Sequence, residues 1–265
     1  MRLTRIAGLV AAGAMTLAIA APVAADSHMA MVRVLHGSPD APSVDTFVND
    51  AKVDALSGAE FGEITGYVAV PGGTYSIKVC ATADNTVCPI GPVDLTFDAG
   101  KKYTVAASDL LAQIKANVFE DITNPSATLA SVRVVHLSAD TPAVDVLTQD
   151  GSATVVDNLA YPNATGYLEL PAASYDLKVC ADADNTVCPL DPGALDLAAG
   201  TAYSVFAVGS LESETPLSAV VAVDAVATPP TDTETTGSPA MLILAAMAAI
   251  GLGLGLRLAP ARARR

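Results

Sequence analysis

The side chains best suited to chemistry occur twice, in the same order and 100 residues apart. Residues 32–45 read VRVLHGSPDAPSVD and residues 132–145 read VRVVHLSADTPAVD. Histidine, serine and aspartate build hydrolase triads, but same-face residues on a strand lie about 6–7 Å apart. A nucleophile and its base must approach to about 3 Å, and the sequence has no G-x-S-x-G elbow. We therefore predict that these residues are not catalytic.

We predict instead that each segment is a corner of the fold, locked by its own polar side chains. Ser38 and Asp40 flank a proline and can accept hydrogen bonds from nearby backbone N–H groups. His36 can donate to a carbonyl or to Asp45. Arg33 can pair with one of these carboxylates while its stem covers apolar surface. The predicted structural residues are Arg33, His36, Ser38, Asp40, Asp45, Arg133, His136, Ser138, Asp140 and Asp145.

A cation site is the alternative use of these side chains. His36, Asp40 and Asp45, or the acidic run at residues 182–185 (DADN), can offer imidazole or oxygen ligands to a metal. The run lacks the glycine and the distal glutamate of an EF-hand loop, and its counterpart at residues 82–85 begins with threonine. We predict no metal and no cofactor, and structural calcium stays open as an alternative.

Each repeat carries one pair of cysteines with seven residues between them, Cys80 and Cys88 in the first and Cys180 and Cys188 in the second. An even count in an exported chain indicates disulfides, and pairing within each repeat is favoured because both repeats carry the same pair. The intervening Asp and Asn residues are turn formers. A four-cysteine zinc site is the alternative, but zinc ligands usually have only two to four residues between them.

The repeat extends far beyond these motifs. Residues 31–120 and 131–220 align without a gap and share 34 identities in 90 positions, which indicates a small domain copied once. Short runs that alternate apolar and polar residues, such as Thr74–Cys80, predict seven strands per copy, with residues 110–115 as a possible helical turn. The predicted fold is all-β: two tandem Ig-like or Greek-key-type β-sandwich domains plus a C-terminal transmembrane helix.

The opening motif of each copy resembles the DUF4397 family of bacterial and archaeal extracytoplasmic domains. Tyr75, the Ala-Gly turn at residues 99–100 and the Tyr-Thr-Val run at residues 103–105 are similar to a later segment of that family. The resemblance covers nearly all of residues 31–226, twice. It implies a β-rich fold and a surface setting, but no reaction, because the function of the family is unknown.

The two ends predict export and anchoring. A basic start, an apolar stretch at residues 6–20 and small residues at 23–25 are typical of a signal peptide. Residues 240–256 are uncharged and apolar, and arginines follow, as in a membrane anchor with a cytoplasmic tail. The run at residues 233–237 (TETTG) only partly matches a sortase motif, so sortase-like processing is a minor alternative. The predicted organisation is signal peptide 1–25, domains 30–125 and 128–226, Pro/Thr-rich stalk 227–239, transmembrane anchor 240–259 and basic cytoplasmic tail 260–265.

Charge and composition narrow the classes of function and of partner that fit this chain. Residues 26–234 hold 28 acidic and eight basic residues, a net charge of −20, which excludes nucleic acid as a partner. We predict a non-catalytic, single-pass cell-surface protein with its C-terminus inside, which serves adhesion, envelope structure or display and binds an extracellular or envelope protein. A module that binds a carbohydrate or a small molecule, with or without calcium, is the alternative, although the chain has no tryptophan to stack on a sugar. An envelope hydrolase comes third.

Overall fold

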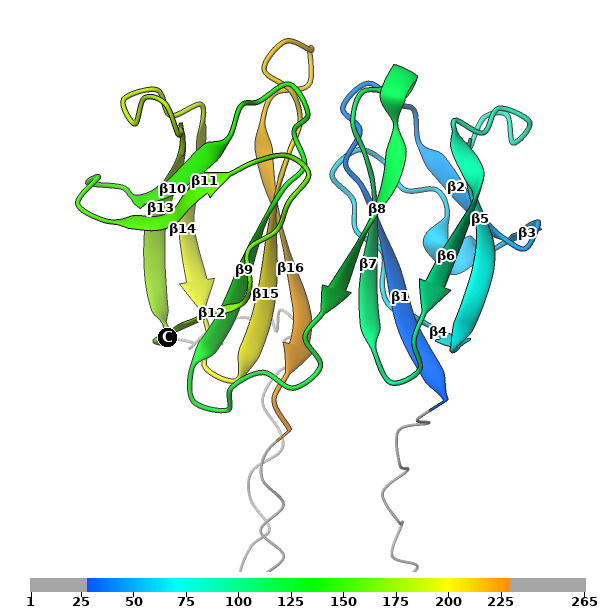
Figure 1. The fold of residues 1–265 in the computed structure, drawn as a ribbon, viewed down its shortest axis with the longest axis horizontal. Helices are drawn as coiled ribbons and strands as arrows, with labels where there is room; N and C mark the ends of the chain where they lie inside the picture. Colours follow the sequence, from blue (N-terminus) through cyan, green and yellow to red (C-terminus); the bar gives the residue numbers. More distant parts are fainter. Residues whose placement is uncertain (1–27, 229–265) are drawn as a thin grey trace, which may run out of the picture. The chain divides into compact units, whose positions relative to one another are not determined.

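The computed structural model describes residues 28–228, which form two copies of an eight-stranded β-fold (Figure 1). Within this range the only helical elements are two three-residue 3-10 turns, so the all-β prediction is confirmed. No helix among these residues is long and apolar enough to cross a membrane. The predicted signal peptide and C-terminal anchor lie outside the described residues.

The first copy consists of two four-stranded sheets that pack face to face (Figure 1). Their strand orders are β4-β1-β7-β8 and β3-β2-β5-β6. β1 and β7 run parallel, and the other neighbours run antiparallel. The strands are β1 (Met29–His36), β2 (Val44–Val48), β3 (Ala51–Lys52), β4 (Val68–Pro71), β5 (Gly73–Ala81), β6 (Ile90–Phe97), β7 (Lys102–Ser108) and β8 (Lys115–Asp121).

The second copy repeats this topology, with strand orders β12-β9-β15-β16 and β11-β10-β13-β14. Its first strand again pairs in parallel with its seventh, β9 with β15. The strands are β9 (Ala130–His136), β10 (Val144–Thr148), β11 (Thr154–Leu159), β12 (Leu168–Leu170), β13 (Ala173–Ala181), β14 (Leu190–Leu197), β15 (Thr201–Val208) and β16 (Ser218–Val226).

Two details differ from the sequence-based expectation. Each copy has eight strands rather than seven, because an additional strand pairs with the second strand of the copy: β3 with β2 in the first and β11 with β10 in the second. The first two strands of each copy lie in different sheets, whereas in an immunoglobulin domain they share a sheet. Residues 110–115 contain the expected helical turn, η2 (Leu111–Gln113), and end at the start of β8.

The two copies differ most in secondary structure at the segment where their sequences differ most. Residues 51–60 and 151–160 share no identity. In the first copy this segment forms β3 and the 3-10 turn η1 (Asp54–Leu56), whose Leu56 is buried. In the second copy it forms β11, a six-residue strand that pairs with β10. The neighbours of β2 and of β10 are therefore different residues in the two copies.

One hydrophobic core contains residues of both copies. Leu35 and Ala106 of the first copy cluster with Phe206 and other apolar residues of the second, and Leu35 and Phe206 are fully buried. The first strands β1 and β9 are therefore buried along most of their length. The two predicted domains, 30–125 and 128–226, thus pack against each other within a single compact unit.

The interior of the second copy is less well filled than that of the first. Apolar side chains of both its sheets line a cavity of about 130 Å³, compared with about 30 Å³ in the first copy. In the first copy the ring of Phe97 packs between Tyr75 and Tyr103, with centroid distances of 6.2 and 5.2 Å. Leu197 stands at the equivalent place in the second copy, so the smaller side chain leaves space.

Replacing Leu197 with phenylalanine is expected to raise the free energy of unfolding by about 0.5–2 kcal/mol. The ring should fill the cavity and pack on Tyr175 and Tyr203, which already pack against the Leu197 cluster. Urea-induced unfolding measures the change. The matched variant Phe97→Leu should be destabilised, because it enlarges the smaller cavity. A less stable L197F protein would show that the cavity does not accept the ring.

Candidate functional site

The structure places the predicted motif residues inside the protein rather than on its surface. Eight of the ten are buried, and the two exceptions are Asp40, which is exposed, and Asp140, which is half-buried. Two groups of contacts result. One group holds the corner after the first strand of each copy, and the other joins the two copies.

At the corner, the histidine of each copy bonds to backbone groups. His36 Nε2 lies 2.9 Å from the carbonyl oxygen of Pro42, and His36 Nδ1 lies 3.4 Å from the amide nitrogen of Ser38. The corresponding distances at His136 are 3.1 and 3.4 Å. A neutral imidazole satisfies both contacts, because Nε2–H donates and Nδ1 accepts. The carbonyl, rather than Asp45, is thus the partner of His36.

The corner aspartates reach the loop that follows the seventh strand. Asp40 Oδ1 accepts a hydrogen bond from the amide of Leu111 at 2.7 Å. Asp140 Oδ2 accepts from the amides of Leu211 and Glu212 at 3.0 and 3.1 Å and from the hydroxyl of Ser210 at 2.5 Å. These hydrogen bonds lower the pKa of Asp140 and outweigh its burial, the largest single influence, which raises it. Each aspartate therefore ties the corner to a loop about 70 residues away along the chain.

Lowering the pH from about 7.5 to about 5 is expected to reduce the stability of the protein. Burial lowers the pKa of His36 and His136 below the ordinary value of 6.5. As the pH falls through 6.5, the unfolded chain binds protons at these imidazoles and the folded protein does not. The stability that is present above this pH is therefore lost as the pH falls toward the folded-state pKa.

Thermal melts at intervals across this pH window measure the effect. The double variant His36→Gln, His136→Gln should melt at a lower temperature at pH 7.5 but depend less on pH. Carboxylates contribute little above pH 5, since their ordinary pKa values lie near about 4. An equally steep pH dependence in the double variant would contradict the assignment to these histidines.

The expected pairing of Arg33 with Asp40 or Asp45 is wrong. Asp45 is neutralised by Lys52, whose Nζ lies 2.7 Å from its Oδ2. Arg33 instead contacts the other copy, where its guanidinium donates to the Asp224 carboxylate and, at 2.9 Å, to the carbonyl oxygen of Val223. The carboxylates near Arg33 in the sequence are not its partners, because the partner lies 191 residues further along the chain.

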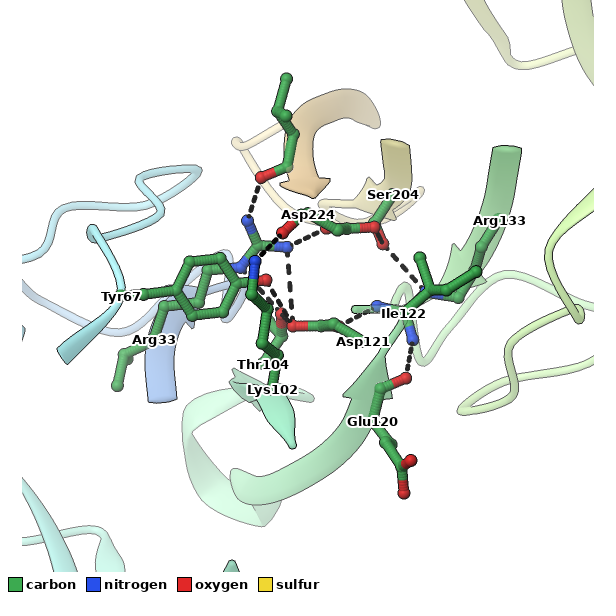
Figure 2. A network of polar contacts seen from close by, with 12 residues as sticks. Arg33, Tyr67, Lys102, Thr104, Glu120, Asp121, Ile122, Arg133, Ser204 and Asp224 are labelled. Atoms are coloured by element: carbon green, nitrogen blue, oxygen red, sulfur yellow. Dashed lines mark hydrogen bonds and ion pairs between the residues drawn. The ribbon is translucent and has the colours of Figure 1, made fainter. Parts of the chain in front are cut away.

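Arg133 of the second copy makes the reciprocal contacts (Figure 2). Its guanidinium donates to the Asp121 carboxylate and, at 2.8 Å, to the carbonyl oxygen of Glu120. Both arginines also donate through Nε to a hydroxyl of their own copy, Thr104 for Arg33 and Ser204 for Arg133, each at 2.9 Å. Each copy thus contributes one arginine and one aspartate to an arginine–aspartate cluster between the copies.

Two tyrosines complete this cluster. Tyr67 Oη donates to Asp121 Oδ2 and Tyr167 Oη donates to Asp224 Oδ2, each at 2.7 Å. The guanidinium of Arg33 lies 4.5 Å from the Tyr67 ring centroid, and that of Arg133 lies 5.0 Å from the Tyr167 ring centroid. Burial, followed by the charge of Asp121, raises the pKa of Tyr67. The Tyr67 hydroxyl therefore stays a donor at any physiological pH.

Lys102 breaks the symmetry of the cluster, because the second copy has an alanine at the equivalent position 202. Its Nζ donates to the carbonyl oxygen of Asp224 at 2.8 Å and lies 5.1 Å from the Tyr67 ring centroid. Burial lowers the pKa of Lys102. The cluster therefore gains a third basic group, and that group also lies between the copies.

Comparison with known protein families agrees with the repeat. The family model described as "Domain of unknown function (DUF4397)" matches residues 30–147 and again residues 130–235. The chain belongs to the DUF4397 family. The resemblance seen in the motifs is confirmed, with two tandem copies. No curated protein matches the chain.

Sequence reasoning missed Asp121 and Asp224, the acidic half of the cluster. The gap-free alignment of the two DUF4397 copies places Asp121 opposite Val221. The loop before β16 is three residues longer than the loop before β8, nine residues against six. A signal was present, because residues 111–120 share only one identity with residues 211–220. A three-residue gap in this segment aligns Asp121 with Asp224. The strand pairing agrees, because the residue before Asp121 pairs with Tyr103 and the residue before Asp224 pairs with Tyr203.

The two disulfides of the DUF4397 copies are as expected, Cys80–Cys88 and Cys180–Cys188. Bonded sulfurs cannot ligate zinc as thiolates, so the zinc alternative is wrong. Each bridge closes a loop between the fifth and sixth strands of its copy. In that loop the carboxylate of Asp84 or Asp184 accepts bonds from the following threonine.

Of the residues expected to offer metal ligands, the structure brings only Asp182 close to other ligand-type side chains. His36, Asp40 and Asp45 have separate partners, and Asp184 bonds Thr186. Within residues 28–228, the one group of ligand-type side chains close enough to share an ion is Asp145, Asp157 and Asp182. We call it the acidic triad.

Proposed function

We propose that this chain is a non-catalytic extracytoplasmic surface protein, whose two DUF4397 copies form one compact unit that displays a binding surface. The arginine–aspartate cluster carries this proposal. Both motif arginines are buried between the copies, where Arg33 donates to Asp224 and Arg133 donates to Asp121. They join the copies and are not available to a substrate.

The corner geometry supports a role without catalysis. Both ring nitrogens of His36 are already in contact with backbone groups, so neither is free to take a proton from Ser38. The hydroxyl of Ser38 instead lies 3.4 Å from Asp40 Oδ1. The second copy has the same arrangement at His136 and Ser138. A histidine held in this way fixes the backbone rather than activating a nucleophile.

The disulfides and the charge support an extracytoplasmic location. Reducing cytosol keeps thiols free, whereas all four cysteines of this chain are bonded. The proposed anchor is residues 240–259, and the net charge of −20 on residues 26–234 favours solubility outside the membrane. The proposed partner is a protein of the cell envelope or its surroundings.

Surface labelling of intact cells that express the full chain tests the location. A membrane-impermeant amine reagent or an added protease should modify the DUF4397 copies in intact cells. A matched chain that ends at residue 239 should appear in the medium, because it lacks the proposed anchor. Copies that are protected in intact cells and become accessible only after lysis would contradict the proposal.

A panel of esterase, glycosidase and peptidase substrates tests the absence of catalysis. The purified full chain and the double variant Ser38→Ala, Ser138→Ala should show the same background rates. Turnover by the native chain that disappears in the double variant would favour the envelope hydrolase.

Pull-down of envelope proteins by the native chain, with a heat-unfolded sample as control, tests the display role.

A ligand-binding module remains the second candidate, and one observation favours it. The acidic triad groups three carboxylates on one sheet of the second copy, where they can bind a cation.

A further inference from the structure

The cavity of about 130 Å³ in the second copy lies between its two sheets and is apolar throughout. Every residue that lines it is apolar, and the lining comes from β9, β12, β15 and β16 of one sheet and from β10, β11, β13 and β14 of the other, or from residues next to them. A water molecule in a cavity needs about two to four polar partners, which these side chains do not supply. The cavity therefore suits an apolar occupant better than water.

The cavity reaches the surface between two strand edges. β14 and β16 are the last strands of the two sheets, so neither has a further neighbour on its outer side. Pro192 and Ala194 on β14 and Val221 on β16 line the cavity and are also exposed, Val221 to 43%. A ligand can therefore enter between these edges without breaking the hydrogen bonds of either sheet.

The first copy fills the equivalent space with its own side chains. Phe97 is 2% exposed and packs between two tyrosine rings, and the cavity beside it measures only about 30 Å³. The second copy has Leu197 at this position and Gly193 where the first copy has Val93, and both residues line the larger cavity. Two smaller side chains on one strand thus accompany the larger space, which is specific to the second copy.

The charges around the opening limit the kind of ligand. β14 carries Asp191 and Asp196 at exposed positions. Residues 128–226 contain 13 acidic residues and only two basic ones, Arg133 and Lys178. Arg133 is bonded to Asp121 in the arginine–aspartate cluster, and Lys178 interacts electrostatically with Asp191. A ligand with a carboxylate or phosphate end would therefore be repelled, whereas an uncharged end would not.

We propose that the second copy binds an alkyl chain of about six carbons, which inserts between β14 and β16 and leaves an uncharged polar end at the surface. The length follows from the volume, because an apolar cavity of about 150 Å³ accommodates the six carbons of benzene. A chain is favoured over a ring because the cavity opens at the strand edges, so that a chain can enter end-on while its polar end stays in water.

Photolabelling of the purified full chain tests the proposal. The probe is a hexyl chain with a diazirine on the chain and a hydroxyl at its end. Mass spectrometry should locate the label on β14 or β16 and not on β6 or β8, the equivalent strands of the first copy, which serve as the internal control. The same probe with a carboxylate in place of the hydroxyl should label several-fold less.

Competition by unlabelled alcohols measures the length of the site. 1-Hexanol should halve the labelling at a concentration on the order of 1 mM, as expected for so small a ligand. From 1-butanol to 1-hexanol this concentration should fall about fourfold per methylene group. Alcohols longer than about seven carbons should gain little more, because the added carbons lie outside the cavity.

Matched variants assign the label to the cavity. Leu197→Phe and Ala219→Leu add bulk from opposite sheets, and each should lose the labelling of β14 and β16. Phe97→Leu changes the equivalent position of the first copy and should leave this labelling intact. Gly193 is not replaced, because its φ of 74° disfavours other residues. Circular dichroism confirms which variants are folded.

Three results would overturn the inference: equal labelling of both copies or of neither, undiminished labelling in a folded cavity-filling variant, or affinity that keeps rising with longer chains. This inference goes beyond the display role and stands independently of it. Photolabelling is measured on the purified chain, whereas surface labelling of cells, substrate turnover and pull-down decide the proposed function.

Discussion

Replacing Asp224 with alanine is expected to lower the free energy of unfolding by about 3–5 kcal/mol. The Asp224 carboxylate accepts hydrogen bonds from Arg33, Tyr167 and Ser204, and its residue is only 1% exposed. Without it, the buried Arg33 guanidinium, the buried Ser204 hydroxyl and the half-buried Tyr167 hydroxyl each lose an acceptor. Leaving one member of a buried ion pair unpaired costs far more than the pair as a whole contributes.

Chemical denaturation of the full chain measures this loss, with Asp196→Ala as the control. Asp196 is an exposed carboxylate on β14, and its replacement should change stability by less than about 0.5 kcal/mol. A double-mutant cycle with Arg33→Ala isolates the contact between the copies. The double variant should be more stable than the sum of the single effects predicts, by about 0.5–3 kcal/mol. Strictly additive effects would mean that Arg33 and Asp224 do not act as a pair.

Replacing Phe206 with alanine is expected to cost a similar amount, about 3–5 kcal/mol. Phe206 is the largest fully buried side chain of the described residues, and it packs in the core that contains Leu35 and Ala106 of the other copy. Truncation to alanine removes the buried ring and leaves a cavity in the core that the two copies share.

The shape of the unfolding curve carries further information. Because the copies share this core, the native chain should unfold in one cooperative transition by both circular dichroism and tyrosine fluorescence. The control Val187→Ala changes an apolar residue that is 53% exposed and should have little effect. A loss below about 1 kcal/mol for F206A, or two separate transitions in the native chain, would contradict a shared core.

The contacts between the copies are reciprocal. Arg33 of the first copy binds Asp224 of the second, and Arg133 of the second binds Asp121 of the first. This exchange is typical of an isologous dimer interface, in which the same surface is used by both partners. Here the two partners belong to one chain. Buried ion pairs contribute little net stability compared with apolar packing, so we interpret their role as setting the register in which the copies meet.

Local patterns in the sequence determined the repeat, the all-β class, the family and the disulfide pairing. The alternation in Thr74–Cys80 survives in the structure as β5, with Ile77 and Val79 buried. The cysteine pairs lie eight positions apart, so chain proximity alone favours their bonding. These features depend on residues that are close in sequence or on copies that are alike.

Only the tertiary structure decided the partners of Arg33 and the members of the acidic triad. Asp224 lies 191 residues from Arg33, and a three-residue loop extension conceals its equivalence to Asp121. Asp157 lies in the segment in which the copies share no identity, and it meets Asp145 only because β11 pairs with β10. Strand order and register bring these charges together. Both depend on how whole sheets bury their apolar faces, which no short sequence pattern encodes.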